Sequence, residues 1–441
     1  MIHIRFRKMT IFALLLSVLL AFTGCSNKET TDDVTDNSPV VDGTLEEDTS
    51  EDKDLAEEAE ASEDDLTSDD IGDEAVLEDI EDEEVEIDED YIVGELPLIE
   101  GGIKGAYDDN GFLNTGTCIN GYVIKSFSDN ITQNYNSVTS ENDMKPEAIL
   151  SQSKSIEAGD LIVEYNSRTR EQLDWAKENN MKVRGHVLVW HSQTPQWIFY
   201  EEFDQKNTLV DRDTMLARME SYIKQNFELL EELGYSEIFY AYDIVNEAVE
   251  DDGSLRDSLW KKVIGDDYIW HAFYYADKYA AEHIKLYYND YNEQFKTEAL
   301  VELAESLVDE DGRSLIDGIG CQAHLYTQDS IFKYMKTLEA FSDTGLDVQI
   351  TEIDVSLGSW QNILEPTDEN LRDQGQYYYE LVNKIIEGNK AGTTNVSGIT
   401  FWGVNDDISW RRDRSPLLFD KDMKPKYSYF GAIQDKSHAG Y

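Results

Sequence analysis

Residues 28–90 lack aromatic residues and cysteine entirely, and they contain almost no positive charge. This segment holds 31 Asp and Glu residues against Lys28 and Lys53, which gives it a net charge of −29. A chain with so much like charge and no large apolar side chains cannot bury enough surface to offset the entropy lost on folding. We expect a disordered, extended acidic tether. Calcium binding is the alternative, but the segment lacks the ligand spacing of an EF-hand loop.

Cysteine and positive charge are scarce in the whole chain. Three cysteines in 441 residues are too few for a disulfide framework. The formal net charge is −55, and residues 91–441 still carry −29 of it. A strongly acidic surface repels a phosphate backbone, so no nucleic-acid partner is expected, and mutual repulsion favours a monomer.

Long apolar runs are also missing, apart from residues 11–22, which Ser17 alone interrupts. Twelve residues are too few to span a bilayer, which takes about 20. A basic start followed by this run is typical of a secretory signal peptide. Thr23-Gly24-Cys25 comes next and resembles a bacterial lipoprotein signal, although Phe22 stands where Leu is usual. Ordinary secretion with an incidental cysteine is the alternative.

These features divide the chain into three parts. Residues 1–24 are expected to be a lipoprotein signal peptide. Residues 25–92 would be the lipidated Cys25 followed by the acidic linker. Residues 93–441 would form the folded domain. Acyl chains on Cys25 would anchor the protein at the extracellular face of a membrane without a transmembrane helix.

All 25 tyrosines and all 8 tryptophans lie from Tyr91 onward, so this part can form a large core. Short apolar runs there read as buried strands. The predicted strands are 113–119, 135–139, 182–190, 239–246, 285–289, 317–323, 346–352 and 397–404. Amphipathic helices are predicted between them, at 215–233 (capped by Asp213 or Thr214), 297–308, 330–341 and 369–387.

Eight strands that alternate with helices predict a (β/α)8 barrel, the TIM barrel fold of the α/β class. An open doubly wound sheet is the alternative. Such sheets often carry a glycine-rich phosphate turn after the first strand, and Cys118-Ile119-Asn120-Gly121 contains none. Cys118 and Cys321 would lie on strands that are not neighbours in the barrel, so both are expected to be buried free thiols.

Polar and aromatic residues gather where these strands end, and in a barrel the carboxyl ends of the strands form the functional face. Indole rings stack on the apolar faces of sugar rings, and amides and carboxylates bind sugar hydroxyls. Glu247 follows the fourth predicted strand and Glu352 ends the seventh, so the two carboxyls could flank a glycosidic bond across the barrel mouth. His186 and His191 lack the spacing of a zinc motif, so neither a metal nor a cofactor is expected.

Five segments together resemble glycoside hydrolase family 10, which consists mainly of endo-β-1,4-xylanases, and the match runs from about Leu96 to about Ile433. The segments are NSVTSENDMK (136–145), VRGHVLVWHSQTPQW (183–197), DIVNEA (243–248), GIGCQAH (318–324) and ITEIDV (350–355). Ser140 and Asp143 depart from the family pattern, where Pro and Glu are more usual.

The resemblance implies catalytic roles. Glu247 is similar to the family's acid/base and Glu352 to its nucleophile. His324 and Asp354 resemble the groups that orient Glu352, and Asn246 resembles a contact to the sugar hydroxyl nearest the reacting carbon.

It also implies the sugar-binding residues. Gln322 resembles a second contact to the same hydroxyl as Asn246. The other implied contacts are His186, Trp190 and Gln193 at the cleaved bond, Glu141, Asn142 and Lys145 at the next sugar on the non-reducing side, and Trp402 and Trp410 as an aromatic lid.

The implied reaction is hydrolysis of xylan and xylo-oligosaccharides by retaining double displacement, with the two carboxyls about 5–5.5 Å apart. Two alternatives stay open. A non-catalytic lipoprotein could capture glycans for a transporter, although a binder has no need of both carboxyls. An enzyme of the same kind could act on a β-1,4-glucan.

Overall fold

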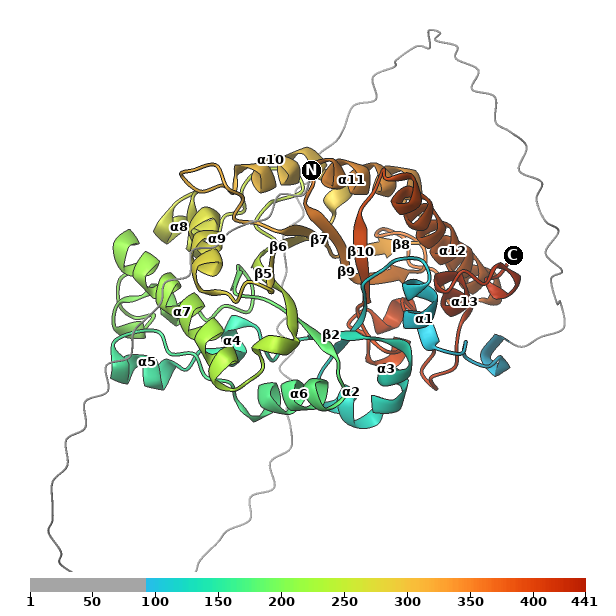
Figure 1. Ribbon diagram of the computed structural model, residues 1–441, viewed down its shortest axis with the longest axis horizontal. Helices are drawn as coiled ribbons and strands as arrows, with labels where there is room; N and C mark the ends of the chain where they lie inside the picture. The colour runs from blue at the N-terminus through green and yellow to red at the C-terminus, as the bar shows by residue number, and fades with distance from the viewer. Residues whose placement is uncertain (1–92) are drawn as a thin grey trace, which may run out of the picture. The chain divides into compact units, whose positions relative to one another are not determined.

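The computed structural model describes residues 93–441, so the predicted signal peptide, Cys25 and the acidic linker lie outside the described residues. Within the described range, eight parallel strands close into a barrel that helices surround (Figure 1). Closure follows from β10, which pairs with β1 on one side and β9 on the other. The predicted (β/α)8 fold is confirmed.

The barrel strands agree with the eight predicted runs to within a few residues. They are β1 (Asn114–Ile119), β2 (Ser137–Ser140), β3 (Lys182–Gly185), β5 (Phe239–Asn246), β6 (Lys285–Asp290), β7 (Gly318–Cys321), β9 (Asp347–Ser356) and β10 (Val396–Phe401). Two short strands extend the barrel at its carboxyl end, namely β4 (Val189–Trp190) beside β5 and β8 (His324–Tyr326) beside β9. The predicted single strand 182–190 is therefore two strands, β3 and β4.

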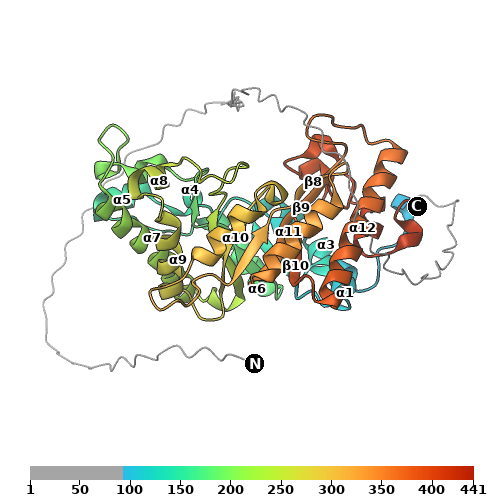
Figure 2. The same cartoon turned by 90° about the horizontal axis from the view of Figure 1, so that it is seen from above.

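The helices lie around this barrel, and Figure 2 shows α9, α10 and α11 along its outer side. They are α1 (Gly102–Asp108), α2 (Gly121–Ser126), α3 (Ser128–Asn134), α4 (Pro146–Ile149), α5 (Gln152–Ala158), α6 (Ser167–Glu178), α7 (Arg212–Glu232), α8 (Leu259–Ile264), α9 (Tyr268–Tyr279), α10 (Thr297–Ser306), α11 (Ile331–Asp343), α12 (Asp368–Ala391) and α13 (Tyr427–Ala432).

The start of α7 corrects one expectation. Asp211, rather than Asp213 or Thr214, caps this helix, and its side chain accepts a hydrogen bond from the Thr214 backbone N–H at 2.8 Å. A cap accepts from the second or third residue inside the helix, so Asp211 sets the start at Arg212. Cys118 and Cys321 are buried free thiols, as expected.

The barrel interior carries a buried polar floor beneath the carboxyl ends of the strands. Arg184 on β3 forms an ion pair with Asp243 on β5 and donates a hydrogen bond to Gln349 on β9 at 3.0 Å. Its guanidinium also lies 4.3 Å from the centre of the Tyr287 ring. Pairing is what makes such deep burial of a charge tolerable. Burial opposes ionisation of Asp243, yet Arg184 and His186 hold the pKa of that carboxyl below its usual range.

Candidate active site

The predicted catalytic residues lie together at the carboxyl end of the barrel. Asn246 ends β5, and Glu247 follows it directly. Gln322 follows β7, His324 begins β8, and Glu352 lies within β9. Parallel strands point their carboxyl ends the same way, so residues far apart in the sequence meet on one face.

A chain of amides joins the two carboxyl groups. Asn289 at the end of β6 donates through one nitrogen to Asn246 Oδ1 and to Glu352 Oε1, both at 2.9 Å. Asn246 donates to Glu247 Oε1 at 3.1 Å, and Gln322 donates to the same oxygen at 2.9 Å. Glu247 and Glu352 are thus held in one hydrogen-bonded network and have fixed positions relative to each other.

Glu352 is built to stay ionised. His324 Nε2 lies 3.4 Å from Glu352 Oε2, and His324 Nδ1 lies 3.1 Å from Asp354 Oδ2. Burial disfavours the imidazolium, but these two carboxylates raise the pKa of His324 to about 9. Burial also opposes ionisation of Glu352, but the His324 hydrogen bond and the nearby positive charges, Lys145 among them, hold the pKa of Glu352 below its usual range. The result is a buried, charged and hydrogen-bonded nucleophile candidate.

Asp354 is held by two further donors. Trp410 Nε1 donates to Asp354 Oδ2 at 2.9 Å, and Arg411 Nη1 donates to Asp354 Oδ1 at 3.1 Å. The half-exposed Trp410 also packs edge-on against His324, with ring centres 4.9 Å apart. The residues predicted to orient Glu352 are therefore themselves fixed from two sides.

Glu247 stands on a left-handed backbone, with φ of 53°. Its N–H donates to the Asn289 carbonyl at 3.0 Å, and its own carbonyl accepts from Arg256 Nε at 2.8 Å. The Trp190 indole donates to Glu247 Oε2 at 2.9 Å, and His191 Nδ1 lies 4.0 Å from that oxygen. A non-glycine residue in this conformation persists only where its surroundings determine it, and here four neighbours do so.

A buried ion pair fixes the turn that follows Glu247. Lys296 Nζ donates to the Val249 carbonyl at 2.6 Å and to Asp290 Oδ1 at 2.8 Å. Tyr288 accepts from the Ala248 N–H at 2.9 Å and donates to Asp290 Oδ2 at 2.5 Å. Lys296 and Asp290 are both fully buried, and burial raises the pKa of Asp290 to about 6 despite the lysine.

The residues predicted to bind the next sugar form a second cluster. Lys145 donates to Asn142 Oδ1 at 3.0 Å and to Gln193 Oε1 at 2.8 Å. Its ammonium lies 4.9 Å from the centre of the Trp190 ring, so the cluster adjoins the carboxyl pair. Asn120 at the end of β1 donates to Glu141 Oε2 at 2.8 Å. This side of the site therefore offers amides, a carboxylate and an ammonium to sugar hydroxyls.

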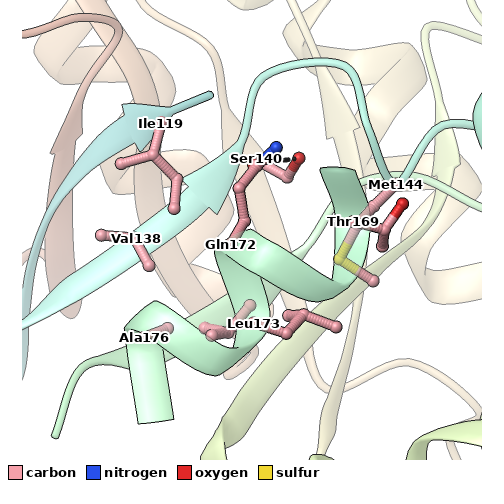
Figure 3. Close-up of a pocket in the computed structure, with 9 residues that line it drawn as sticks. Ile119, Val138, Ser140, Met144, Thr169, Gln172, Leu173 and Ala176 are labelled. Atoms are coloured by element: carbon pink, nitrogen blue, oxygen red, sulfur yellow. Dashed lines mark hydrogen bonds between the residues drawn. The ribbon is translucent and has the colours of Figure 1, made fainter. Parts of the chain in front are cut away.

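Ser140 and Asp143, the two departures from the family pattern, connect the segment that carries this cluster to α6. Ser140 donates to Gln172 Oε1 at 2.9 Å, and Gln172 on α6 donates to Asp143 Oδ2 at 2.6 Å. Thr169 on the same helix donates to the Asp143 carbonyl at 2.7 Å. Figure 3 shows Ser140 and Gln172 facing each other across the layer between β2 and α6, where a gap of only about 10 Å³ remains.

Replacing Gln172 by methionine tests this anchor. Methionine keeps the packing but leaves Ser140 and Asp143 without their shared partner, so we expect a loss of about 1–3 kcal/mol in the free energy of unfolding. Urea unfolding followed by circular dichroism measures it. Glu178→Met, which replaces an exposed residue at the end of α6, is the control and should shift stability by less than about 0.5 kcal/mol. Equal stability of the two variants would contradict the anchor.

His186 and Trp402 form the buried floor of the site. His186 Nδ1 lies 3.0 Å from Asp243 Oδ2, which ties the imidazole to the polar floor of the barrel. Trp402 is 7% exposed and meets the His186 ring edge-on, with centres 5.7 Å apart. Trp190 flanks the same imidazole at 6.3 Å. Of the two predicted lid residues, Trp410 is exposed and Trp402 is almost fully covered by protein.

Sequence reasoning missed several residues of this network. Asn289 was seen only as the end of a strand, although its position among the strand ends was a usable signal. The space for it comes from Gly320 on β7, where a Cβ would stand 2.4 Å from Asn289 Oδ1. Asn120 and Arg411 were not assigned roles either. Arg411 follows Trp410 directly, and that adjacency was its signal.

Within residues 93–441, no group of three or more His, Cys, Asp or Glu side chains is arranged to hold a metal ion. No helix in that range is both long and apolar enough to cross a membrane.

The family comparison matches residues 102–435 to the family described as glycosyl hydrolase family 10. Endo-1,4-beta-xylanase B of Butyrivibrio fibrisolvens is 35% identical over 317 residues, covering 69% of this chain and 48% of that protein. Bifunctional endo-1,4-beta-xylanase XylA of Ruminococcus flavefaciens is 36% identical over 337 residues, covering 74% of this chain and 33% of that protein. The chain thus spans half or less of the length of these relatives.

A solved structure extends the likeness to the fold. It contains the CBM22-1 and GH10 modules of Clostridium thermocellum endo-1,4-beta-D-xylanase 10B complexed with xylohexaose. Its TM-score to this chain is 0.68 at 32% sequence identity, and the alignment covers 78% of this chain and 70% of that one.

Proposed function

The chain belongs to glycoside hydrolase family 10, and we propose that it is an endo-1,4-β-xylanase that hydrolyses internal xylosidic bonds with retention of configuration. The observation that carries the proposal is the carboxyl pair. Glu247 and Glu352 share one amide network, but of the two carboxyl groups only that of Glu352 contacts the positively charged His324. Two carboxyls in different environments at one site are what retaining hydrolysis needs.

The mechanism proceeds in two displacements. Ionised Glu352 attacks the anomeric carbon while protonated Glu247 gives its proton to the leaving glycosidic oxygen, so a xylosyl ester forms on Glu352. Glu247, now ionised, takes a proton from water, and that water attacks the anomeric carbon and releases Glu352. Asn246 and Gln322 both donate to Glu247 Oε1, and Gln322 also donates to Asn246 Oδ1 at 3.2 Å. The two amides therefore lie together beside Glu247, where they can bind a sugar hydroxyl.

Xylan is the proposed substrate because of the family and the named activity of the relatives. A second sugar on the non-reducing side is proposed to bind the cluster of Glu141, Asn142, Lys145 and Gln193, because carboxylate, amide and ammonium groups form hydrogen bonds with sugar hydroxyls. Trp410 presents an exposed indole beside His324 for stacking on a sugar ring.

Reducing-sugar release from xylan and from a soluble cellulose derivative tests the proposal. We expect release from xylan and far less from the glucan. Nuclear magnetic resonance of the first-formed anomer should show the β configuration. No release from either polymer by folded protein would favour the glycan-binding lipoprotein, whereas preferred release from the glucan would change the substrate alone.

We further propose that the mature protein is a monomeric, secreted lipoprotein anchored through Cys25, with residues 26–92 as its tether. The support is the residue pattern described above, together with the net charge of −29 on residues 28–90. Such a segment repels itself and extends, which would hold the folded domain away from an anionic surface.

Replacing Cys25 by alanine should move the protein from the membrane fraction to the soluble fraction, because the acceptor of the acyl chains is gone. Immunoblots of fractionated cells measure the distribution. Ser26→Ala is the matched control and should stay membrane-bound. A Cys25→Ala protein that still sediments with membranes would rule out this anchor.

A further inference from the structure

Ala323 lies between two side chains of the site, one for each carboxyl group. Gln322 before it donates to Glu247 Oε1 at 2.9 Å. His324 after it has its Nε2 at 3.4 Å from Glu352 Oε2. Ala323 itself is fully buried and has a left-handed backbone, with φ of 60°. A residue with a Cβ keeps this conformation only where its surroundings hold it, so the contacts of Ala323 matter to both carboxyl groups.

The side chain of Glu293 provides one of these contacts. Glu293 begins the short helical turn η5 (Glu293–Phe295) after β6, and its Oε1 accepts a hydrogen bond from the Ala323 N–H at 3.3 Å. The neighbouring Gln322 N–H donates to the Asp290 carbonyl at 2.9 Å. Successive peptide groups of this segment are thus held by the chain after β6, and Glu293 supplies the side-chain acceptor.

The backbone of Glu293 is fixed at the start of α10. Its carbonyl accepts from the Lys296 N–H at 3.2 Å and from the Thr297 hydroxyl at 2.9 Å. The residue is buried, with 1% of its surface exposed. The carboxyl group of Glu293 therefore extends from a fixed base toward Ala323.

This carboxyl group is buried without a cation of its own. Lys296 forms its ion pair with Asp290 at 2.8 Å, and within residues 93–441 no Lys, Arg or His pairs with Glu293. The ionisable groups that face Glu293 are Asp290 on β6, Lys296 before α10, Cys321 on β7 and Tyr334 on α11. Burial raises the pKa of Glu293 to about 7, although backbone N–H groups, that of Ala323 among them, favour its ionised form.

A buried carboxyl group of this kind is costly to keep. An apolar side chain of similar size would pack here without the loss of hydration that a carboxyl group suffers. It could not accept the Ala323 N–H, which would then be a buried donor without this acceptor. That contact is what Glu293 adds over an apolar side chain, and the mechanism above makes no other use of it.

We propose that Glu293 is a positioning residue of the active site. Its carboxyl group holds Ala323, and through it the two side chains, Gln322 and His324, that position the carboxyl pair. Glu293 acts through this segment rather than on the sugar. The kinetic part of the inference rests on the proposed xylanase function, whereas the effect on His324 does not.

Two substitutions in the full-length protein separate reach from charge. Glu293→Asp keeps a carboxyl group that is one methylene too short for the Ala323 N–H, whereas Glu293→Gln keeps the reach and accepts through an uncharged amide oxygen. With the nitrophenyl β-glycoside of xylobiose, we expect kcat to fall roughly tenfold in Glu293→Asp, as the loss of one hydrogen bond would give. KM should stay the same because the cluster around Lys145 is unchanged. Glu293→Gln should keep most of the wild-type kcat.

The titration of His324 gives a second reading that needs no substrate. Against the effect of burial, Asp354 and Glu352 raise the pKa of His324 to about 9, which depends on the imidazole staying close to both. Nuclear magnetic resonance of isotope-labelled histidine follows this titration, and the His324 signal is the one absent from His324→Gln. We expect a midpoint of about 9 in the wild type and in Glu293→Gln. In Glu293→Asp it should be roughly one pH unit lower, because the imidazole is no longer held against both carboxylates.

Glu302→Asp, which makes the same change at an exposed position of α10, is the control and should alter neither reading. A Glu293→Asp protein with the wild-type kcat and His324 midpoint would overturn the positioning role. An equal loss in Glu293→Gln would also overturn it, because the charge and not the reach would then matter. If Glu293→Asp does not fold, Glu293→Gln decides: wild-type readings support the acceptor role, and altered readings overturn it. An inactive wild type would remove the proposed function, while the titration would still test how His324 is held.

Discussion

Replacing Glu352 by alanine is expected to abolish the proposed xylan hydrolysis and leave a folded protein. The variant lacks the group that forms the glycosyl ester, so neither displacement can occur, and we expect kcat to fall by about 10⁵-fold or more. Folding should survive because His324 keeps its second carboxylate partner, Asp354, at 3.1 Å. Initial rates of reducing-sugar release give the loss, and thermal unfolding confirms that the variant is folded.

Glu365→Ala is the control for that variant. Glu365 is an exposed carboxylate in the segment between β9 and α12, so its removal changes the charge equally without touching the site. We expect its rate to match the wild type. If the Glu352→Ala protein kept more than about a hundredth of the rate, the nucleophile would have to be another group.

Replacing Lys296 by methionine will destabilise the protein strongly. The change leaves Asp290 buried without its partner at 2.8 Å and deprives the Val249 carbonyl of its donor. Removing one member of a buried ion pair costs about 3–5 kcal/mol in the free energy of unfolding. Urea unfolding measures the cost. Because Val249 lies two residues after Glu247, we also expect the folded variant to have a lower kcat.

Two comparisons separate this effect from a general loss of charge. Lys285→Met removes a half-exposed lysine whose pair with Asp347 is 2.7 Å long, and it should cost less than about 1 kcal/mol. Adding Asp290→Asn to Lys296→Met removes the stranded charge and should recover part of the stability. A Lys296→Met protein as stable as Lys285→Met would contradict the buried pair.

The barrel was predictable because its strands are short apolar runs separated by amphipathic helices. Both patterns of apolar residues can be recognised in a sequence. The positions of Glu247 and Glu352 were predictable because residues at the carboxyl ends of parallel strands share one face, although β9 continues to Ser356, four residues beyond Glu352. The break between β3 and β4 was not. Residues 187–189 are as apolar as a continuous strand, but His186 before them contacts Asp243 at 3.0 Å, a residue 57 positions away in the chain.

The supporting network was hidden for the same reason. Asn289 joins Asn246 and Glu352, which lie 43 and 63 positions away, and its place at a strand end does not reveal either partner. Lys296 looked like any lysine near the start of a helix, and only the fold shows that it is fully buried. The local periodicity of a sequence reveals which faces of helices and strands are buried. Which polar side chains are buried with them depends on partners that are distant in the sequence.

The amide network between the two carboxyls has a consequence for repeated turnover. Asn246, Asn289 and Gln322 carry no charge at any working pH, so they keep the same donors and acceptors at every stage of the cycle. Glu247 changes its protonation state twice and Glu352 is esterified and released, yet these three amides have no proton to lose or regain. The amide network is therefore ready for the next cycle as soon as product leaves.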